Sequence, residues 1–199
     1  SIAATIPANT PLGTGYLIRV VSNTPVTIGT PYAVSLSVSA APFAGDDGAI
    51  VLCKNTGTYD LFQLLAGTPS VCGTWSGPTG ALAGGMFNTA TDNAGAYVYT
   101  TNCPGACPQD VATLTVTLQN PANAGSNVTT ALCSNDPPTD VHDLVLNGDI
   151  NGFFYYQGQS SPQPDLTIPG SYPLTYIVFG VGPCENDTSE FILDVNEAP

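Results

Sequence analysis

The sequence repeats itself at an interval of about 80 residues. The phrase that begins at Ala44-Gly45 and ends at Cys53 returns as Ala124-Gly125 ending at Cys133. Aromatic, Gly-Tyr and Pro/Cys phrases then follow in the same order in both copies. A period of this length exceeds the roughly 20 to 50 residues of most solenoid repeats and is typical of modules that each fold around their own core. The sequence therefore predicts three units, at 1–42, 43–121 and 122–199.

Alternation of apolar and polar residues is the main local signal. It occurs at 16–21, 32–38, 97–99 and 114–118, and each segment is flanked by Gly, Pro, Asn or Asp. This pattern predicts half-buried strands, and short strands separated by turn residues indicate an all-β fold of antiparallel β-sandwiches. The stretch 60–65 is the one exception, because its leucines follow an Asp at helical spacing; it fits a short helix or a bulged strand.

Residues 1–42 resemble only the back half of such a unit. The segment from Ile6 to Tyr16 matches Phe87 to Tyr97, and 32–38 matches a final strand. Three strands with an open apolar face are not stable alone. We expect either a segment cut from a longer chain or strands supplied from elsewhere.

The charge balance excludes several classes of partner. The net charge is −13, and Arg19 and Lys54 are the only Lys or Arg residues. Nucleic acids and anionic membrane surfaces both require clusters of cations, so neither is an expected partner. No run of 18 apolar residues occurs, and the first residues lack a basic and apolar leader, so we expect no membrane insertion and either a mature chain or a cut piece.

Six cysteines are available to staple modules that are small for independent stability. Six cysteines allow 15 connectivities, and the repeat guides the choice. Cys53 and Cys107 occupy the places that Cys133 and Cys184 occupy one repeat later. We therefore predict the disulfides Cys53–Cys107, Cys133–Cys184 and Cys72–Cys103. Zinc binding would need tight C-x2-C pairs, which are absent, and disulfides imply an oxidising compartment.

The aromatic residues are expected to be structural. Trp75 is the only Trp, and Phe153 or Phe154 stands at its place in the next repeat. We expect it to fill the core over a disulfide; an exposed Trp would instead form a stacking platform for a sugar ring. Tyr16, Tyr97 and Tyr172 each follow a Gly and fit a tyrosine corner, whose hydroxyl bonds the turn just upstream.

The sequence carries no catalytic signature. His142 is the only histidine and is expected to be a solvated loop residue without an equivalent in the other units. No H-E-x-x-H, nucleophile elbow or Walker loop occurs, so we predict that the chain is not an enzyme.

Carboxylates form the one candidate cation site. Asp46, Asp47 and Asp92 fall in predicted loops, and loop carboxylates with carbonyl oxygens could supply the six to eight ligands of calcium. No D-x-D-x-D-G loop is present, so solvated acidic loops are the alternative. We expect no other cofactor.

Several phrases together carry a family resemblance. They are the Leu-Cys strands after Ala-Gly, Gly73-Thr-Trp-Ser-Gly-Pro78, Phe87 to Tyr99, and Cys107-Pro ahead of a Thr/Val strand. They resemble the tandem repeats of giant Bacteroidota surface proteins, including gliding-motility adhesins of the SprB kind. The resemblance is strongest over 43–121 and weaker over 122–199, where Trp is replaced, and the opening residues resemble a related Ig-like unit.

The resemblance implies tandem Ig-like sandwiches, export through type IX secretion, display at the cell surface as a filament, and adhesion to a substratum or polysaccharide during gliding. No binding residues carry over from it. We expect a non-enzymatic stalk and adhesive segment whose immediate partners are neighbouring repeats of the same chain. The alternatives are a carbohydrate-binding or spacer module of a secreted enzyme, and a filament subunit completed by a donated strand.

Overall fold

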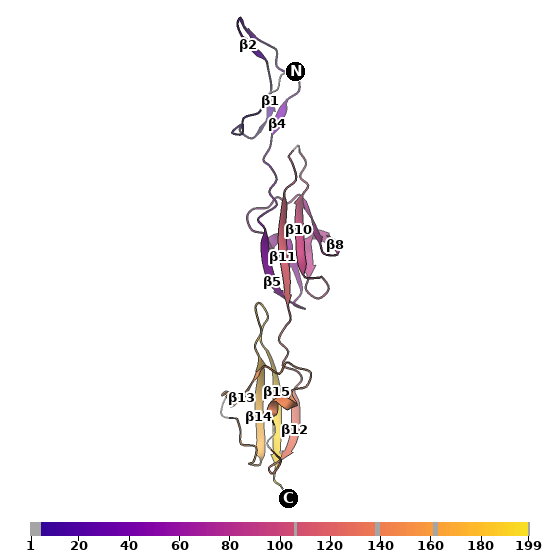
Figure 1. Cartoon of the computed structure of the whole chain (residues 1–199), viewed down its shortest axis with the longest axis vertical. Coiled ribbons are helices and arrows are strands. Elements are labelled where there is room, and N and C mark those ends of the chain that lie inside the picture. The colour runs from indigo at the N-terminus through magenta and orange to yellow at the C-terminus, as the bar shows by residue number, and fades with distance from the viewer. Residues whose placement is uncertain (1–4, 106, 138–139, 161–162, 199) are drawn as a thin grey trace.

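The computed structural model describes residues 5–105, 107–137, 140–160 and 163–198. Within these ranges the regular structure consists of β-strands and single turns of 3-10 helix. Figure 1 shows three bodies in a row, with the N-terminus near one end and the C-terminus at the other. We name them the N-terminal unit (up to residue 42), the middle module (43–121) and the C-terminal module (122–199).

The middle module has a five-stranded sheet of order β5-β11-β10-β7-β8 and a second sheet of two strands, β6 and β9. One buried core lies between the sheets and includes Leu61, Phe87, Tyr97 and Leu114. The elements are β5 (Gly48–Cys53), β6 (Thr58–Asp60), η1 (Leu61–Leu64), β7 (Gly73–Gly77), β8 (Gly80–Leu82), η2 (Ala83–Gly85), β9 (Met86–Asn88), β10 (Gly95–Thr101) and β11 (Val111–Gln119).

The C-terminal module has a four-stranded sheet of order β12-β15-β14-β13 and a core of its own. In the part that the structure describes, a turn of 3-10 helix and irregular chain cover this sheet, with Val141, Leu144 and Leu166 packed on the core. The elements are β12 (Val128–Cys133), η3 (Val141–Leu144), β13 (Phe153–Tyr156), β14 (Gly170–Val178) and β15 (Asp187–Asn196).

Both large sheets share one strand order. The first strand of each module runs parallel to the last, which pairs antiparallel with the strand before it, and that strand pairs antiparallel with the next. This is the order of an immunoglobulin-like sandwich. The prediction of an all-β, Ig-like, disulfide-containing fold is confirmed, with one parallel edge in each otherwise antiparallel sheet.

Alternation correctly predicted the central strands. Ala112, Leu114 and Val116 of β11 are buried, while the threonines between them are less buried or exposed. In β15, Phe191, Leu193 and Val195 are buried in the same way. Period-2 patterning works here because successive side chains of a strand point to opposite faces of the sheet.

The N-terminal unit is a pair of two-stranded ribbons, β1 (Gly13–Tyr16) with β4 (Leu36–Val38) and β2 (Val21–Asn23) with β3 (Val26–Ile28). The strand predicted at 16–21 is therefore wrong, because Tyr16 ends β1, Val21 begins β2 and the residues between them belong to no strand. The strand predicted at 32–38 is shorter than expected, because only β4 forms there. None of the described residues up to 42 is buried. Most of its large apolar side chains are exposed: Ile6, Leu12, Leu17, Ile18, Val20, Val21, Val26, Ile28, Tyr32 and Val34.

The helix-like stretch at 60–65 is a single 3-10 turn, η1, and the Asp60 side chain accepts a hydrogen bond from the Phe62 backbone N–H at 3.0 Å. Among the described residues, no helix has the length and apolar character needed to cross a bilayer.

Candidate functional site: the junction between modules

A disulfide joins the two Ig-like modules. Cys53, the last residue of β5, is bonded to Cys184 in the β14–β15 loop, with Cα atoms 5.1 Å apart. Both cysteines are buried. The predicted pairs Cys53–Cys107 and Cys133–Cys184 are therefore wrong.

Strand direction explains the error. Cys53 lies opposite Gln119, at the end of β11, whereas Cys107 precedes the start of β11 at Val111. The nine residues of β11 span roughly 30 Å at about 3.3 Å per residue. The two cysteines of one module thus lie at opposite ends of its sheet, far beyond the Cα separation that a disulfide allows.

The β14–β15 loop reaches back onto the end of the middle module. Cys184 Sγ lies 3.5 Å from the Gln119 carbonyl oxygen, and the Lys54 backbone N–H donates to that same oxygen at 2.9 Å. The linker Asn120-Pro121 follows directly after β11. Two connections, one of backbone and one of sulfur, therefore join the modules at the same edge.

A carboxylate at the start of each last strand explains the repeated Ala-Gly phrase. The Asp110 carboxylate accepts a hydrogen bond from the Ala44 backbone N–H at 2.8 Å, and Asp187 accepts one from Ala124 N–H at 2.8 Å. Both alanines are completely buried. The sequence reasoning missed the role of these two aspartates, although both stand three residues after the repeated Cys.

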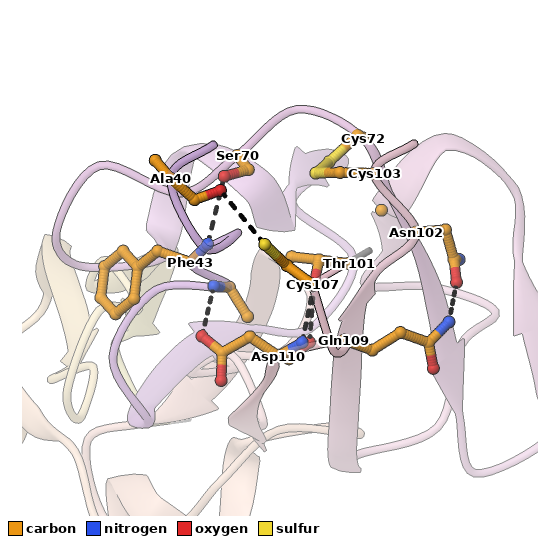
Figure 2. Close-up of a disulfide and its surroundings, with 12 residues drawn as sticks. Ala40, Phe43, Ser70, Cys72, Thr101, Asn102, Cys103, Cys107, Gln109 and Asp110 are labelled. Carbon is orange, nitrogen blue, oxygen red and sulfur yellow. Dashed lines mark hydrogen bonds between the residues drawn. A yellow bond between two sulfur atoms is a disulfide. The ribbon is translucent and has the colours of Figure 1, made fainter. Parts of the chain in front are cut away.

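The disulfide Cys72–Cys103 is confirmed. It links the residue before β7 to a residue just after β10, and the Asn102 backbone N–H donates to the Cys72 carbonyl oxygen at 2.9 Å. Figure 2 shows this bridge beside the β10–β11 loop. It reinforces two neighbouring strands within the middle module.

Cys107 and Cys133 are free thiols, so the expectation that all six cysteines are bridged is wrong for these two. In Figure 2 the Cys107 sulfur points toward the linker at Ala40, whose carbonyl oxygen lies 3.8 Å away. Cys133 is exposed at the end of β12.

The three candidate calcium ligands each have local contacts. The Asp47 carboxylate accepts a hydrogen bond from Thr113 N–H at 2.7 Å, and the Asp92 carboxylate accepts one from Asn88 N–H at 2.8 Å. Asp46 pairs through its backbone with Ala66. Among the described residues, no three His, Cys, Asp or Glu side chains are grouped so as to hold a metal ion. Calcium binding stays an untested prediction.

Trp75 lies in the core, as predicted, with 6% of its surface exposed. Its ring packs against Tyr99, with centroids 5.2 Å apart, and not over a disulfide that joins the two sheets. Phe154 is its equivalent, because it pairs with Tyr176 as Trp75 pairs with Tyr99.

The three predicted tyrosine corners are confirmed. The hydroxyls of Tyr16, Tyr97 and Tyr172 donate to backbone carbonyl oxygens four or five residues upstream, at 2.7–2.8 Å. Burial, followed by the negative charge of Asp92, raises the pKa of Tyr97. The phenol therefore stays protonated and keeps its role as a donor.

Two further tyrosines were missed. The Tyr99 hydroxyl donates to Ser70 O at 2.6 Å and accepts from Gly73 N–H at 2.8 Å. Tyr176 makes the same pair of bonds with Asp149 O and Gly152 N–H. Aligning the modules on Cys107 and Cys184 places the two tyrosines at one position, which is the signal that could have found them.

The His142 side chain is 42% exposed, so solvent reaches it as predicted, but the expectation that it has no equivalent in the other units is wrong. It is the second residue of η3, as Phe62 is of η1, and its ring lies edge-on to Phe154 with centroids 5.1 Å apart. Its Nδ1 lies 3.0 Å from Asp140. Its position is thus the structural counterpart of Phe62, a partly buried aromatic residue packed against the core of the middle module.

No family model and no curated protein matches the chain. Several solved structures of tandem domains are similar to it in outline. The I-band fragment I67–I69 of titin is 13% identical, with 80% of this chain and 67% of that chain covered and a TM-score of 0.36. Sidekick-1 immunoglobulin domains 1–4 are 14% identical, with 98% and 60% covered and a TM-score of 0.37. Protocadherin gamma B2 cadherin domains 1–5 are 13% identical, with 94% and 46% covered and a TM-score of 0.28. Such low scores carry no argument about function.

Proposed function

We propose that this chain is a non-enzymatic, load-bearing spacer of an extracellular filament. The observation that carries the proposal is the Cys53–Cys184 bridge between consecutive modules. The in-line arrangement of the three bodies in Figure 1 supports it, because a spacer must project along one axis. Disulfides also persist in the oxidising extracellular environment that such a filament occupies.

The bridge gives the spacer a mechanical property. It closes a covalent loop between residues 131 positions apart in sequence, and most of both module cores lies inside that loop. A force applied to the two ends passes from Cys53 to Cys184 through sulfur. The enclosed strands are therefore shielded from extension even if the sheets separate.

The resemblance to giant Bacteroidota surface proteins narrows the proposal to an adhesin stalk. In that setting the chain would be exported by type IX secretion, stand at the cell surface, and hold or form an adhesive surface for a substratum or polysaccharide during gliding. The net charge of −13, with two cations, suits a surface that does not bind nucleic acid.

Single-molecule stretching tests the load-bearing role. The full chain would be held by fused marker domains and pulled in oxidising and in reducing buffer. Reduction should release the enclosed 131 residues, which adds about 430–470 Å of contour length at 3.3–3.6 Å per residue.

The matched control is the variant Cys53→Ser/Cys184→Ser. It retains the Cys72–Cys103 bridge, with a sequence separation of 31, so reduction should add only about 100–110 Å. An oxidised wild-type chain that extends as far as the reduced one would contradict the proposal.

A filament subunit completed by strand donation is the second candidate. It is favoured by the exposed apolar side chains of the N-terminal unit, among them Ile18, Val26 and Tyr32. Light scattering of the purified chain over a wide concentration range tests it. Self-association that is abolished by Ile18→Ser with Val26→Ser would support donation, and a monomer throughout would oppose it.

The sugar-binding alternative is not favoured by Trp75, which is buried and cannot serve as an open stacking platform.

A further inference from the structure

We infer that Cys107 and Cys133 each form a further inter-module disulfide of the Cys53–Cys184 kind. The partner of each is a cysteine in another repeat of this type. Cys133 would bond the last-loop cysteine of a repeat placed after the C-terminal module. Cys107 would bond a first-strand cysteine that lies parallel to β4. The inference rests on the geometry of the junction and not on adhesion or load bearing.

The surroundings of Cys133 reproduce those of Cys53. Each is the last residue of the first strand, and each lies opposite the end of the last strand, Gln119 in one module and Asn196 in the other. The next residue in each module, Lys54 or Ser134, donates its backbone N–H to that opposite residue at 2.9 Å. The register and the exit of the chain are therefore the same.

The two cysteines differ in whether another part of the chain covers them. Cys53 is 4% exposed because the β14–β15 loop lies over it, whereas Cys133 is exposed. Cys133 thus presents the same strand end without the loop that would cap it.

The surroundings of Cys107 reproduce those of Cys184. The two loops have equal length, from Thr101 to Asp110 and from Val178 to Asp187, and each closes with backbone pairing between its end residues. Each has a glycine with positive φ two residues before the cysteine. The two cysteines therefore stand at the same position in loops of the same length.

Both loop sulfurs also lie against the end of the preceding last strand. Cys184 Sγ is 3.5 Å from the Gln119 carbonyl oxygen. Cys107 Sγ is 4.0 Å from the carbonyl oxygen of Ser39 and 3.8 Å from that of Ala40, the first and second residues after β4, and Figure 2 shows the contact with Ala40. In the middle module, the strand that lies parallel to β11 at this place is β5, which ends in Cys53. A first strand parallel to β4 would end beside Cys107.

The chemistry is ordinary disulfide formation. Two thiols lose two protons and two electrons as one S–S bond forms, and a disulfide oxidant accepts them and becomes two thiols. Because Cys133 falls between Cys53 and Cys184 in sequence, successive bridges would enclose overlapping loops. Each module would then be held by the covalent loops on both sides of it.

Extending the full chain tests the Cys133 bridge. A copy of residues 123–199 is appended after Pro199, which keeps the natural number of linker residues. The copy carries Cys133→Ser, to remove its own free thiol, and Glu185→Asp as a mass label beside its Cys184. Peptide mapping without reduction should then show Cys133 bonded to the labelled peptide, and alkylation of Cys133 should fall to background.

The original Cys53–Cys184 bridge is the internal control in the same digest. A second control adds Cys133→Ser in the original C-terminal module, which should leave the labelled Cys184 open to alkylation. A labelled peptide that bonds elsewhere, or Cys133 that remains alkylated beside a protease-resistant copy, would overturn the inference.

The second arm tests Cys107 independently. Residues 1–39 are replaced by a copy of residues 122–196 that carries Cys184→Ser and the mass label Asn135→Gln. Cys107 should pair with Cys133 of that copy, at the position that Ser39 now borders. A missing bridge at either new junction would overturn the inference for the cysteine at that junction. Neither readout depends on adhesion or mechanical strength, so failure here is distinct from failure of the spacer role.

Discussion

At the scale of single residues, the Ala-Gly phrase shows why a short motif can recur through modules that otherwise diverge. Ala124 is completely buried and its N–H is held by Asp187, and Gly125 has φ +79°. A Cβ at Gly125 would lie 2.6 Å from the Leu146 carbonyl oxygen. Neither position tolerates a larger side chain, so the phrase is set by backbone geometry.

Gly125→Ala should therefore destabilise the C-terminal module by roughly 2–4 kcal/mol, from left-handed backbone strain together with the steric conflict. Gly158→Ala is the matched control, because Gly158 has a similar φ of +77° and open space around its Cβ direction. It should cost only about 1 kcal/mol. Denaturant unfolding followed through the module's aromatic signal compares the two, and equal costs would refute the packing argument.

The buried tyrosine hydroxyls at the repeated position give a second residue-scale prediction. Tyr99→Phe leaves Ser70 O and Gly73 N–H without their partner, which should cost about 1–3 kcal/mol. Tyr176→Phe should cost a similar amount because its bonds are the same. Tyr59→Phe, which loses one exposed contact with Thr56, should cost under about 1 kcal/mol in the same unfolding measurement.

At the scale of elements, the two 3-10 turns show one design with different side chains. Asp60 and Asp140 each cap the turn by accepting the N–H of the second residue, which is Phe62 in η1 and His142 in η3. The cap and the half-buried ring fix the turn over the sheet. The ring can therefore change from Phe to His while the turn is kept.

The Asp140 cap predicts a pH dependence. Hydrogen bonds from the His142 backbone and side chain hold the pKa of Asp140 below its ordinary 3.8. A depressed carboxyl pKa adds stability that is present above 3.8 and is lost as the pH falls through the folded-state value. Asp140→Ala should thus lower stability at neutral pH and have a shrinking effect in acid.

Urea unfolding at neutral and acidic pH measures this effect. Asp143→Ala is the comparison, because Asp143 is exposed in the same turn. A loss for Asp140→Ala that stays constant down to low pH would show that the cap does not act through its charge.

At the scale of the whole molecule, the bridge gives the two Ig-like modules a second point of attachment, which we expect to restrict their relative orientation. The linker of a few residues with Pro121 already restricts the angle, and the Cys53–Cys184 bond adds a second point of attachment at the same junction. We expect small-angle scattering of Cys53→Ser/Cys184→Ser to show a smaller average maximum dimension than wild type, and a distance distribution without sharply separated module-to-module distances, because the modules can bend at the junction. Cys72→Ser/Cys103→Ser, which removes a bridge inside one module, should leave that distribution unchanged.

Local sequence patterns were sufficient to predict the central strands and several core and turn residues. Alternation located the central strands around Leu114, the Gly-Tyr phrases located the three tyrosine corners, and the lone Trp was correctly placed in the core. These features depend on neighbours within a few residues or on one face of a strand, which the sequence records directly. No strand spans 16–21, and the strand at 32–38 is reduced to β4, because the burial that stabilises such alternating strands is absent around these residues.

The amino-acid sequence by itself determined the repeat, the all-β class and which cysteines are equivalent to one another. It did not determine which cysteines bond to each other. Aligning the repeats shows which cysteines occupy the same position, and that alignment is identical whether a disulfide forms within one module or between two. Only the tertiary structure decided this, since the parallel pairing of β5 with β11 places Cys53 at the end of the sheet that faces the next module. The direction of β5, which depends on long-range packing, is the reason that Cys53 forms a disulfide between modules and not the predicted disulfide within one module.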